Sequence, residues 1–187
     1  MIAFSKQIIA FLEELDDLVR TKRPMTLYLI GGAAITLAFD EENRTSDLDL
    51  IDPPDILTRI GGFESALAKK YNIHVSPLAE ISFSVPNNWK EKLTLLPLGL
   101  RNLAVFVPCL EDILLGKMAR LEPRDFEDIL ALHEKKLINL KKLLDRLKEN
   151  KKELRELSYR NNAKLFFQEI FQMNLIFQKG DIKVSHL

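Results

Sequence analysis

A glycine pair, Gly31-Gly32, interrupts an apolar segment early in the chain. Residues 25–30 before the pair are apolar and rich in strand-forming residues, which predicts a buried β-strand. Residues 33–39 after the pair form a short helical pattern, and residues 40–43 form a polar turn. A second strand is expected over residues 47–51. A strand, a glycine pair, a helix and a second strand therefore follow one another within 27 residues, 25–51.

Two aspartates lie on the second of these strands. Side chains at positions i and i+2 of a strand point to the same face, so Asp47 and Asp49 project together while Leu48 and Leu50 turn toward the core. Neighbouring carboxylates resist joint ionisation unless a cation lies between them. Magnesium prefers oxygen ligands and is often shared with substrate phosphates. The pair therefore predicts a magnesium site, with manganese as the other candidate ion.

The glycine pair suggests a second role beside that metal. Glycine allows a backbone to approach a bulky anion closely, and a helix start presents N–H groups to phosphate. Phosphate binding next to a metal site is what phosphoryl or nucleotidyl transfer requires. In the alternative interpretation, Gly31-Gly32 is a tight turn, and Asp47 and Asp49 are solvated residues at a strand end.

The order of these motifs resembles the signature of the DNA polymerase β-type nucleotidyltransferase superfamily, with 14 residues between Gly32 and Asp47. The run Arg44-Thr-Ser-Asp-Leu-Asp is similar to the minimal nucleotidyltransferases of the abortive-infection (AbiEii-like) group found in toxin–antitoxin loci. Leu110–Lys117 and Arg124–Asp128 resemble a later motif of that group. The resemblance covers residues 25–132.

The resemblance implies an α+β nucleotidyltransferase fold, with a mixed β-sheet flanked by helices over residues 1–132 and a C-terminal helical region over 133–187. It also implies transfer of a nucleotidyl group from a nucleoside triphosphate to an acceptor hydroxyl, with release of pyrophosphate. The acceptor would be a tRNA, a protein or a small molecule. A cognate toxin or antitoxin is the implied partner.

Site residues are carried over from the resemblance by position. Asp47 and Asp49 would bind the metal. Gly31, Gly32 and Ser46 would contact the triphosphate, and Arg44 would position their loop or bind phosphate. Lys117 would contact a phosphate or the leaving pyrophosphate, and Asp125 or Asp128 would orient Lys117 or the acceptor. Glu80, before an expected strand at 81–85, is the candidate for a third metal-binding carboxylate.

Two other functions remain open. A missing third carboxylate would favour an inactive or weakly active binding module, a partner in a toxin–antitoxin pair that keeps the fold. A kinase-like phosphotransferase is the remaining alternative.

Charge and cysteine content restrict the setting of these functions. The formal net charge is zero, but residues 133–164 carry 11 Lys/Arg against 5 Asp/Glu. This basic stretch suggests RNA contact or, equally, an ordinary solvated helix. Cys109 is the only cysteine, which fits a reducing compartment, and no segment is apolar enough to span a membrane, so a cytoplasmic location is expected.

The remaining elements are expected from periodicity. Helices are predicted over 3–22, 54–71, 110–121 and 123–136, and the chain from 137 onward reads as almost entirely helical. Strands are predicted over 73–75 and 81–85, with a hairpin formed by 93–98 and 103–107. His74, His133 and His186 have no ligand spacing, which argues against a zinc site.

Overall fold

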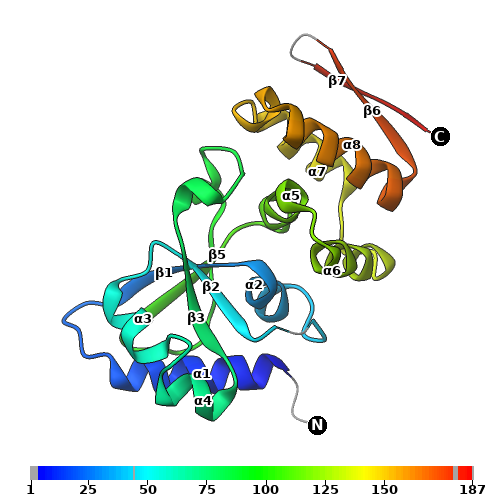
Figure 1. Cartoon of the computed structure of the whole chain (residues 1–187). Coiled ribbons are helices and arrows are strands. Elements are labelled where there is room, and N and C mark those ends of the chain that lie inside the picture. Colours follow the sequence, from blue (N-terminus) through cyan, green and yellow to red (C-terminus); the bar gives the residue numbers. More distant parts are fainter. Residues whose placement is uncertain (1–3, 44, 179–180, 187) are drawn as a thin grey trace. The chain divides into compact units, whose positions relative to one another are not determined.

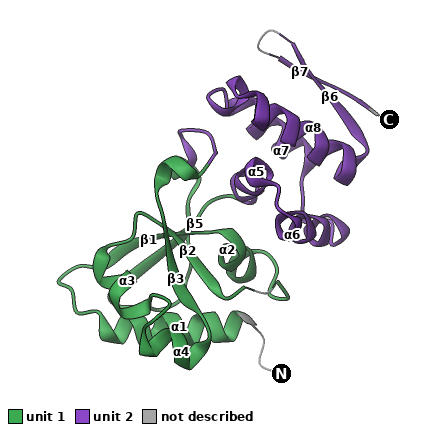
Figure 2. Ribbon diagram, viewed as in Figure 1, with its two compact units in different colours: residues 1–83, 90–109 green, residues 84–89, 110–187 purple. Residues whose placement is uncertain are grey.

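The structure is a computed structural model that describes residues 4–43, 45–178 and 181–186 (Figure 1). The chain forms two compact units (Figure 2). Unit 1 contains residues 1–83 and 90–109, and unit 2 contains residues 84–89 and 110–187. The division at 109/110 differs from the expected boundary at 132/133, because the helices between these positions pack against the later helices of unit 2.

Unit 1 is built on a five-stranded sheet with the order β3-β2-β1-β5-β4. Its strands are β1 (Met25–Ile30), β2 (Asp47–Ile51), β3 (His74–Leu78), β4 (Thr94–Leu95) and β5 (Leu103–Val107). β1 is antiparallel to β2 and parallel to β5, and β2 is parallel to β3. The predicted mixed sheet is therefore confirmed, as is the predicted hairpin, in which β4 pairs antiparallel with β5.

Four helices accompany this sheet: α1 (Phe4–Leu18), α2 (Gly31–Ala38), α3 (Asp55–Gly61) and α4 (Ala66–Tyr71). α1 places Ile8, Phe11, Leu12 and Leu15 in the core, as its periodicity predicts. It ends at Leu18, which is 53% exposed, rather than continuing to residue 22.

The single helix predicted over 54–71 is wrong, because the chain is extended at Gly62. The Gly62 N–H donates to Thr58 O and ends α3. Ser65 then caps α4 by accepting a hydrogen bond from the Ala68 N–H at 3.0 Å. A Cβ at Gly62 would lie 2.3 Å from Thr58 O, so this break requires glycine.

The strand predicted over 81–85 is also wrong. Residues Glu80–Ser82 form a single 3₁₀ turn, in which the N–H of Phe83 donates to Glu80 O at 3.0 Å. These local hydrogen bonds replace the ladder that a strand would need, and Ile81 is left 81% exposed.

Unit 2 contains the remaining helices and a separate hairpin. Its main helices are α5 (Leu110–Arg120), α6 (Pro123–Glu134), α7 (Leu140–Glu149) and α8 (Leu157–Phe171), with a 3₁₀ turn, η3 (Glu153–Arg155), between the last two. Phe166 and Phe167 of α8 are fully buried. No helix in the described ranges combines the length and apolarity needed to cross a bilayer.

The expectation of helix to the end of the chain is wrong for the last segment. α8 ends at Phe171, its C-cap residue Gln172 adopts the left-handed conformation, and the strands β6 (Met173–Gln178) and β7 (Asp181–His186) follow. They form an antiparallel two-stranded sheet. Met173 and Leu175 are buried and alternate with the less buried Asn174 and Ile176, which is the two-residue period of a strand.

Candidate active site

The two aspartates lie side by side on β2, as the sequence predicts. Leu48 and Leu50 are buried on one face, while Asp47 and Asp49 are half-buried on the other. The Asp47 side chain is 41% exposed to solvent. The Ser46 hydroxyl donates to Asp47 Oδ1 at 3.1 Å. The pair is therefore positioned by the strand and is accessible from solvent.

Gly31 makes room for the second of these carboxylates. β1 pairs with β2 so that Ile30 lies opposite Asp49, and Gly31 follows directly with a φ of +66°. A Cβ at Gly31 would lie 2.3 Å from Asp49 Oδ2. Both the positive φ and this close approach require glycine. Gly31 and Gly32 also begin α2, so the pair is not an isolated tight turn.

Gly32 has a different neighbour, the loop that leads into β2. The Asn43 side-chain amide donates to Gly32 O at 3.0 Å, and the Thr36 hydroxyl lies 2.9 Å from Gly32 O and 3.1 Å from Asn43 O. A Cβ at Gly32 would lie 3.0 Å from Thr45 Cβ. These contacts hold the loop against α2 just before Asp47. The sequence reasoning missed Thr36, Asn43 and Thr45, although polar residues around a turn could have indicated them.

Arg44, which the resemblance places in this loop, lies outside the described residues. Its neighbour Thr45 is buried, and its hydroxyl accepts a hydrogen bond from the Asp47 N–H at 3.2 Å. The backbone that begins β2 is thus fixed by a side chain two residues earlier.

β3 brings two further polar side chains beside the aspartates. In the parallel pairing of β2 with β3, His74 lies opposite Asp47 and Ser76 lies opposite Asp49. His74 Nε2 is 3.5 Å from Asp47 Oδ1. The Phe63 ring meets the His74 ring edge-on at 5.2 Å between centroids. Sequence reasoning missed His74 as a site residue, because only the strand register brings it to Asp47.

A cavity of about 530 Å³ opens along this edge of unit 1. Its lining includes Arg59, Phe63, His74 and Ser76. Neither aspartate lines the cavity, but His74, which does, lies 3.5 Å from Asp47 Oδ1.

Lys117 and its expected partners form a separate cluster within unit 2. Lys117 Nζ donates to Asp125 Oδ1 at 2.9 Å and to Asp128 Oδ2 at 2.6 Å. Arg120 donates to both oxygens of Asp125, at 3.2 and 2.9 Å. Lys117 and Asp125 are both buried. The cluster joins α5 to α6 and balances its charges internally.

Comparison with known protein families shows which family the chain belongs to. The family described as "Nucleotidyltransferase of unknown function (DUF6036)" matches residues 6–174. The chain belongs to this family. The match begins in α1 and ends in β6, so this nucleotidyltransferase family includes most of unit 2 and extends beyond the motifs at 25–132. No curated protein and no solved structure matches the chain.

The third carboxylate expected in the nucleotidyltransferase site is not brought to the other two. Glu80 lies in the 3₁₀ turn after β3, where its Oε2 accepts a hydrogen bond from Lys90 Nζ at 2.7 Å. Among the described residues, no group of three or more His, Cys, Asp or Glu side chains is placed to hold a metal ion. On β3, the residue opposite Asp49 is Ser76, which is not an acid.

Asp47 and Asp49 nevertheless fit a magnesium ion shared with a substrate. Magnesium in nucleotide sites is commonly held by one or two carboxylates, with waters and substrate phosphates completing its shell. The two side chains share one face of β2, and Gly31 lacks the Cβ that would clash with Asp49 Oδ2, so the carboxylate can keep this position. The site therefore matches the chemistry of a phosphate-bound divalent cation.

Proposed function

We propose that the chain transfers a nucleotidyl group from a nucleoside triphosphate to an acceptor hydroxyl in a magnesium-dependent reaction. The acceptor oxygen would bond to the α-phosphorus, the α–β phosphoanhydride bond would break, and pyrophosphate would leave. The observation that carries the proposal is the position of Asp47 and Asp49 on one face of β2, with Gly31 beside Asp49 Oδ2.

Each local element has a defined part in this proposal. Asp47 and Asp49 would hold the magnesium, which would neutralise charge on the triphosphate when bound. The N-terminus of α2 has no side-chain cap, so its backbone N–H groups are candidate phosphate donors. Ser46, held against Asp47, would contact the triphosphate from the loop side.

The cavity lined by Phe63 and His74 is the candidate acceptor site. It adjoins Asp47 through His74 and carries an exposed aromatic ring together with Arg59. A ring and a guanidinium suit an acceptor that has a flat or anionic part. A tRNA end, a protein side chain and a small molecule remain the three acceptor classes of the proposal.

Lys117 and Asp125 enter the proposal as positioning residues, since Lys117 Nζ already bonds two carboxylates. Their effect would come through the α5–α6 pair rather than through contact with phosphate. This assignment differs from the phosphate contact that the resemblance implies for Lys117.

One observation favours a second candidate function. The residue opposite Asp49 on β3 is Ser76, so no third carboxylate joins the aspartates from that position. Glu80, the expected third carboxylate, is paired with Lys90. A nucleotidyltransferase fold with two acids would suit a triphosphate-binding partner in an AbiEii-like toxin–antitoxin pair, with slow turnover or none.

Labelled triphosphates distinguish these functions. The protein is incubated with magnesium, each α- or γ-labelled triphosphate and either total tRNA, cell protein or small hydroxyl compounds. Transfer of the α-label alone supports the nucleotidyltransferase, whereas transfer of the γ-label identifies a phosphotransferase. Triphosphate binding without transfer, together with a stoichiometric protein partner, supports the binding module.

Two double variants control this assay. Asp47→Asn/Asp49→Asn is expected to abolish transfer. Asp17→Asn/Asp55→Asn makes the same change in charge at exposed positions of unit 1 and is expected to retain it. Equal activity in both variants would contradict the proposed site.

A further inference from the structure

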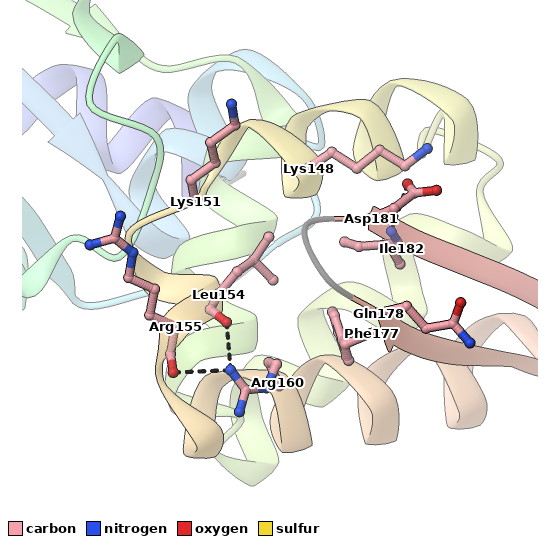
Figure 3. Close-up of a pocket in the computed structure, with 9 residues that line it drawn as sticks. All are labelled: Lys148, Lys151, Leu154, Arg155, Arg160, Phe177, Gln178, Asp181 and Ile182. Carbon is pink, nitrogen blue, oxygen red and sulfur yellow. Dashed lines mark hydrogen bonds between the residues drawn. The ribbon is translucent and has the colours of Figure 1, made fainter.

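Unit 2 contains a cavity of about 610 Å³, lined by none of the residues of the aspartate site (Figure 3). The C-terminal part of α7, the η3 segment, the start of α8 and the β6–β7 hairpin line it. We call this cavity the basic pocket, because its lining includes Lys148, Lys151, Arg155 and Arg160 but only one acid, Asp181. Its volume lies within the range of about 300–1,000 Å³ that is typical of small-ligand sites.

The four cations of the basic pocket lack acidic partners within the described part of the chain. Ion pairs form close by, between Lys152 and Glu153 and between Arg146 and Glu149, but none joins an acid to these four residues. Residues 133–164, which include all four, carry 11 Lys/Arg against 5 Asp/Glu. The pocket therefore concentrates positive charge that a bound anion would neutralise.

Arg160 is held by hydrogen bonds to the backbone. Its Nη1 donates to Leu154 O at 2.7 Å and to Arg155 O at 3.0 Å (Figure 3). These two bonds use one nitrogen of the guanidinium and fix the orientation of its plane. The remaining N–H groups keep the fork geometry that binds phosphate oxygens in pairs.

Apolar side chains give the basic pocket a floor for a planar ring. Leu154, Phe177 and Ile182 face the same space in Figure 3. Phe177 is half-buried, and Lys164 Nζ lies 5.9 Å from its ring centroid. Aromatic side chains bind nucleic-acid bases by stacking in a manner that tolerates any base.

Polar groups of the hairpin complete the match to one class of ligand. Asp181 and Gln178 flank the apolar floor, and they offer a carboxylate and an amide to hydroxyl or amino groups. The charged ends of Lys151 and Arg155 point away from the apolar floor in Figure 3, so these two rim cations can reach only phosphates that lie outside it. A ligand that has a planar ring, hydroxyl groups and several phosphates would match these pocket groups, and a nucleotide has all three.

We propose that the basic pocket is a second nucleotide-binding site, independent of the aspartate pair and of magnesium. Arg160 would bind the nucleotide's own phosphate, Phe177 would contact its base, and Lys148 would act with the rim cations Lys151 and Arg155. The rim cations would bind either the outer phosphates of a free nucleotide or the adjoining phosphates of a single-stranded RNA. These two sources share the same chemistry and are separated by experiment.

Binding is measured with the full chain carrying Asp47→Asn/Asp49→Asn, in EDTA, so that the aspartate site contributes nothing. One probe is a fluorescein-labelled 12-nucleotide oligouridine followed by anisotropy, and the other is labelled ATP followed by equilibrium dialysis. Lys148→Gln/Lys151→Gln/Arg155→Gln is expected to weaken binding at least about tenfold, because single-strand affinity depends on the number of phosphates neutralised. Arg160 is retained in this variant, because it also holds two backbone carbonyls.

The matched control is Lys136→Gln/Lys141→Gln/Lys142→Gln, which removes the same charge from exposed positions of unit 2 outside the pocket. It is expected to weaken binding less than about threefold. Binding of RNA alone or of ATP alone supports the site and identifies the source. Equal weakening in both triple variants, or no binding of either probe, would overturn the proposal.

The base-binding role of Phe177 has its own test. Phe177→Leu keeps an apolar side chain but removes the ring, and it is expected to weaken nucleotide binding about fivefold or more. Inorganic tripolyphosphate is expected to compete poorly with ATP. If tripolyphosphate competes as well as ATP and Phe177→Leu has no effect, the pocket binds phosphate without a base and the nucleotide assignment is wrong.

Discussion

The aspartate pair of unit 1 and the buried ion pairs of unit 2 place charged side chains in different surroundings. In unit 1, Asp47 and Asp49 lie together on a half-exposed strand face, and Gly31 makes room for the Asp49 carboxylate. In unit 2, Lys117 is buried between Asp125 and Asp128, and Arg146 is buried against Asp112 with bonds of 2.6 and 2.8 Å. All of these residues are charged, but the aspartates are half-buried neighbours of like charge, whereas the buried cations of unit 2 lie against carboxylates.

This difference separates functional from structural charge. Two carboxylates placed side by side carry an electrostatic cost that a bound cation would remove. A buried cation that bonds to carboxylates is already compensated, and its removal leaves an unpaired charge in the interior. Substitutions in unit 1 should therefore change activity, whereas substitutions of the buried pairs in unit 2 should change stability.

The largest effect is expected at the aspartate pair. Asp47→Asn or Asp49→Asn should lower nucleotidyl transfer about 10³-fold, because each removes charge stabilisation that the reaction requires. The melting temperature should stay within about 2 °C of wild type or rise, because the substitution relieves repulsion at a half-exposed site. Label transfer and thermal unfolding measure the two outcomes, and a large loss of stability would contradict the comparison.

The next effect is expected at Arg146. Arg146→Met should lower the free energy of unfolding by about 3–5 kcal/mol, because it leaves Asp112, which has no exposed surface, without its partner. Asp112→Leu/Arg146→Met should recover much of this loss, because neither charge then remains. Urea unfolding measures both variants. If the double variant is as unstable as the single one, packing rather than the ion pair accounts for the loss.

A smaller and more local effect is expected at Gly31. Gly31→Ala should weaken metal-dependent triphosphate binding, since its Cβ would lie 2.3 Å from Asp49 Oδ2. Gly99→Ala is the control, because Gly99 also has a positive φ, +71°, but nothing lies within 4 Å of its Cβ position. Both variants should lose about 1–2 kcal/mol of stability from the left-handed conformation. Calorimetric titration with magnesium and a triphosphate compares them, and equal binding by both would show that the clearance is unimportant.

The smallest effect is expected for an exposed ion pair of unit 1. Glu14 accepts hydrogen bonds from Lys70 and from the Tyr71 hydroxyl, and these lower the pKa of its carboxyl, with the Lys70 bond as the largest cause. Because this pKa is lower in the folded state, the ion pair stabilises the fold at pH values above the ordinary pKa of glutamate. The stabilisation is lost as the pH falls through the lower pKa of the folded state. Glu14→Gln should therefore melt below wild type at pH 7, and the two should converge in acid. Melting temperatures between pH 7 and pH 2 measure this, and parallel curves would contradict it.

The features predicted correctly from the sequence depend on local spacing. β1 follows from its run of strand-forming residues, and β2 with the shared face of Asp47 and Asp49 follows from two-residue periodicity. A helix after the glycine pair was also predicted, but α2 begins at Gly31 rather than at residue 33. These relations span only a few residues, so a single segment contains all of their information.

The features that were missed depend on distant segments. His74 reaches Asp47 only through the register of β3, and Arg146 meets Asp112 across 34 positions of sequence. The β6–β7 hairpin was read as helix, because Phe166, Phe167 and Ile170 of α8 begin an apolar run that continues into β6. Glu80 was chosen for a strand that does not form, and the 3₁₀ turn places it with Lys90 instead.

The central claim is that Asp47 and Asp49 together hold a divalent cation shared with a nucleotide. Electron paramagnetic resonance of Mn²⁺ tests it directly, with a non-hydrolysable triphosphate analogue present. The claim predicts that the wild type and Gly99→Ala remove Mn²⁺ from solution with one-to-one stoichiometry and that Asp47→Asn/Asp49→Asn does not. Retention of the same bound Mn²⁺ by the double variant would contradict it.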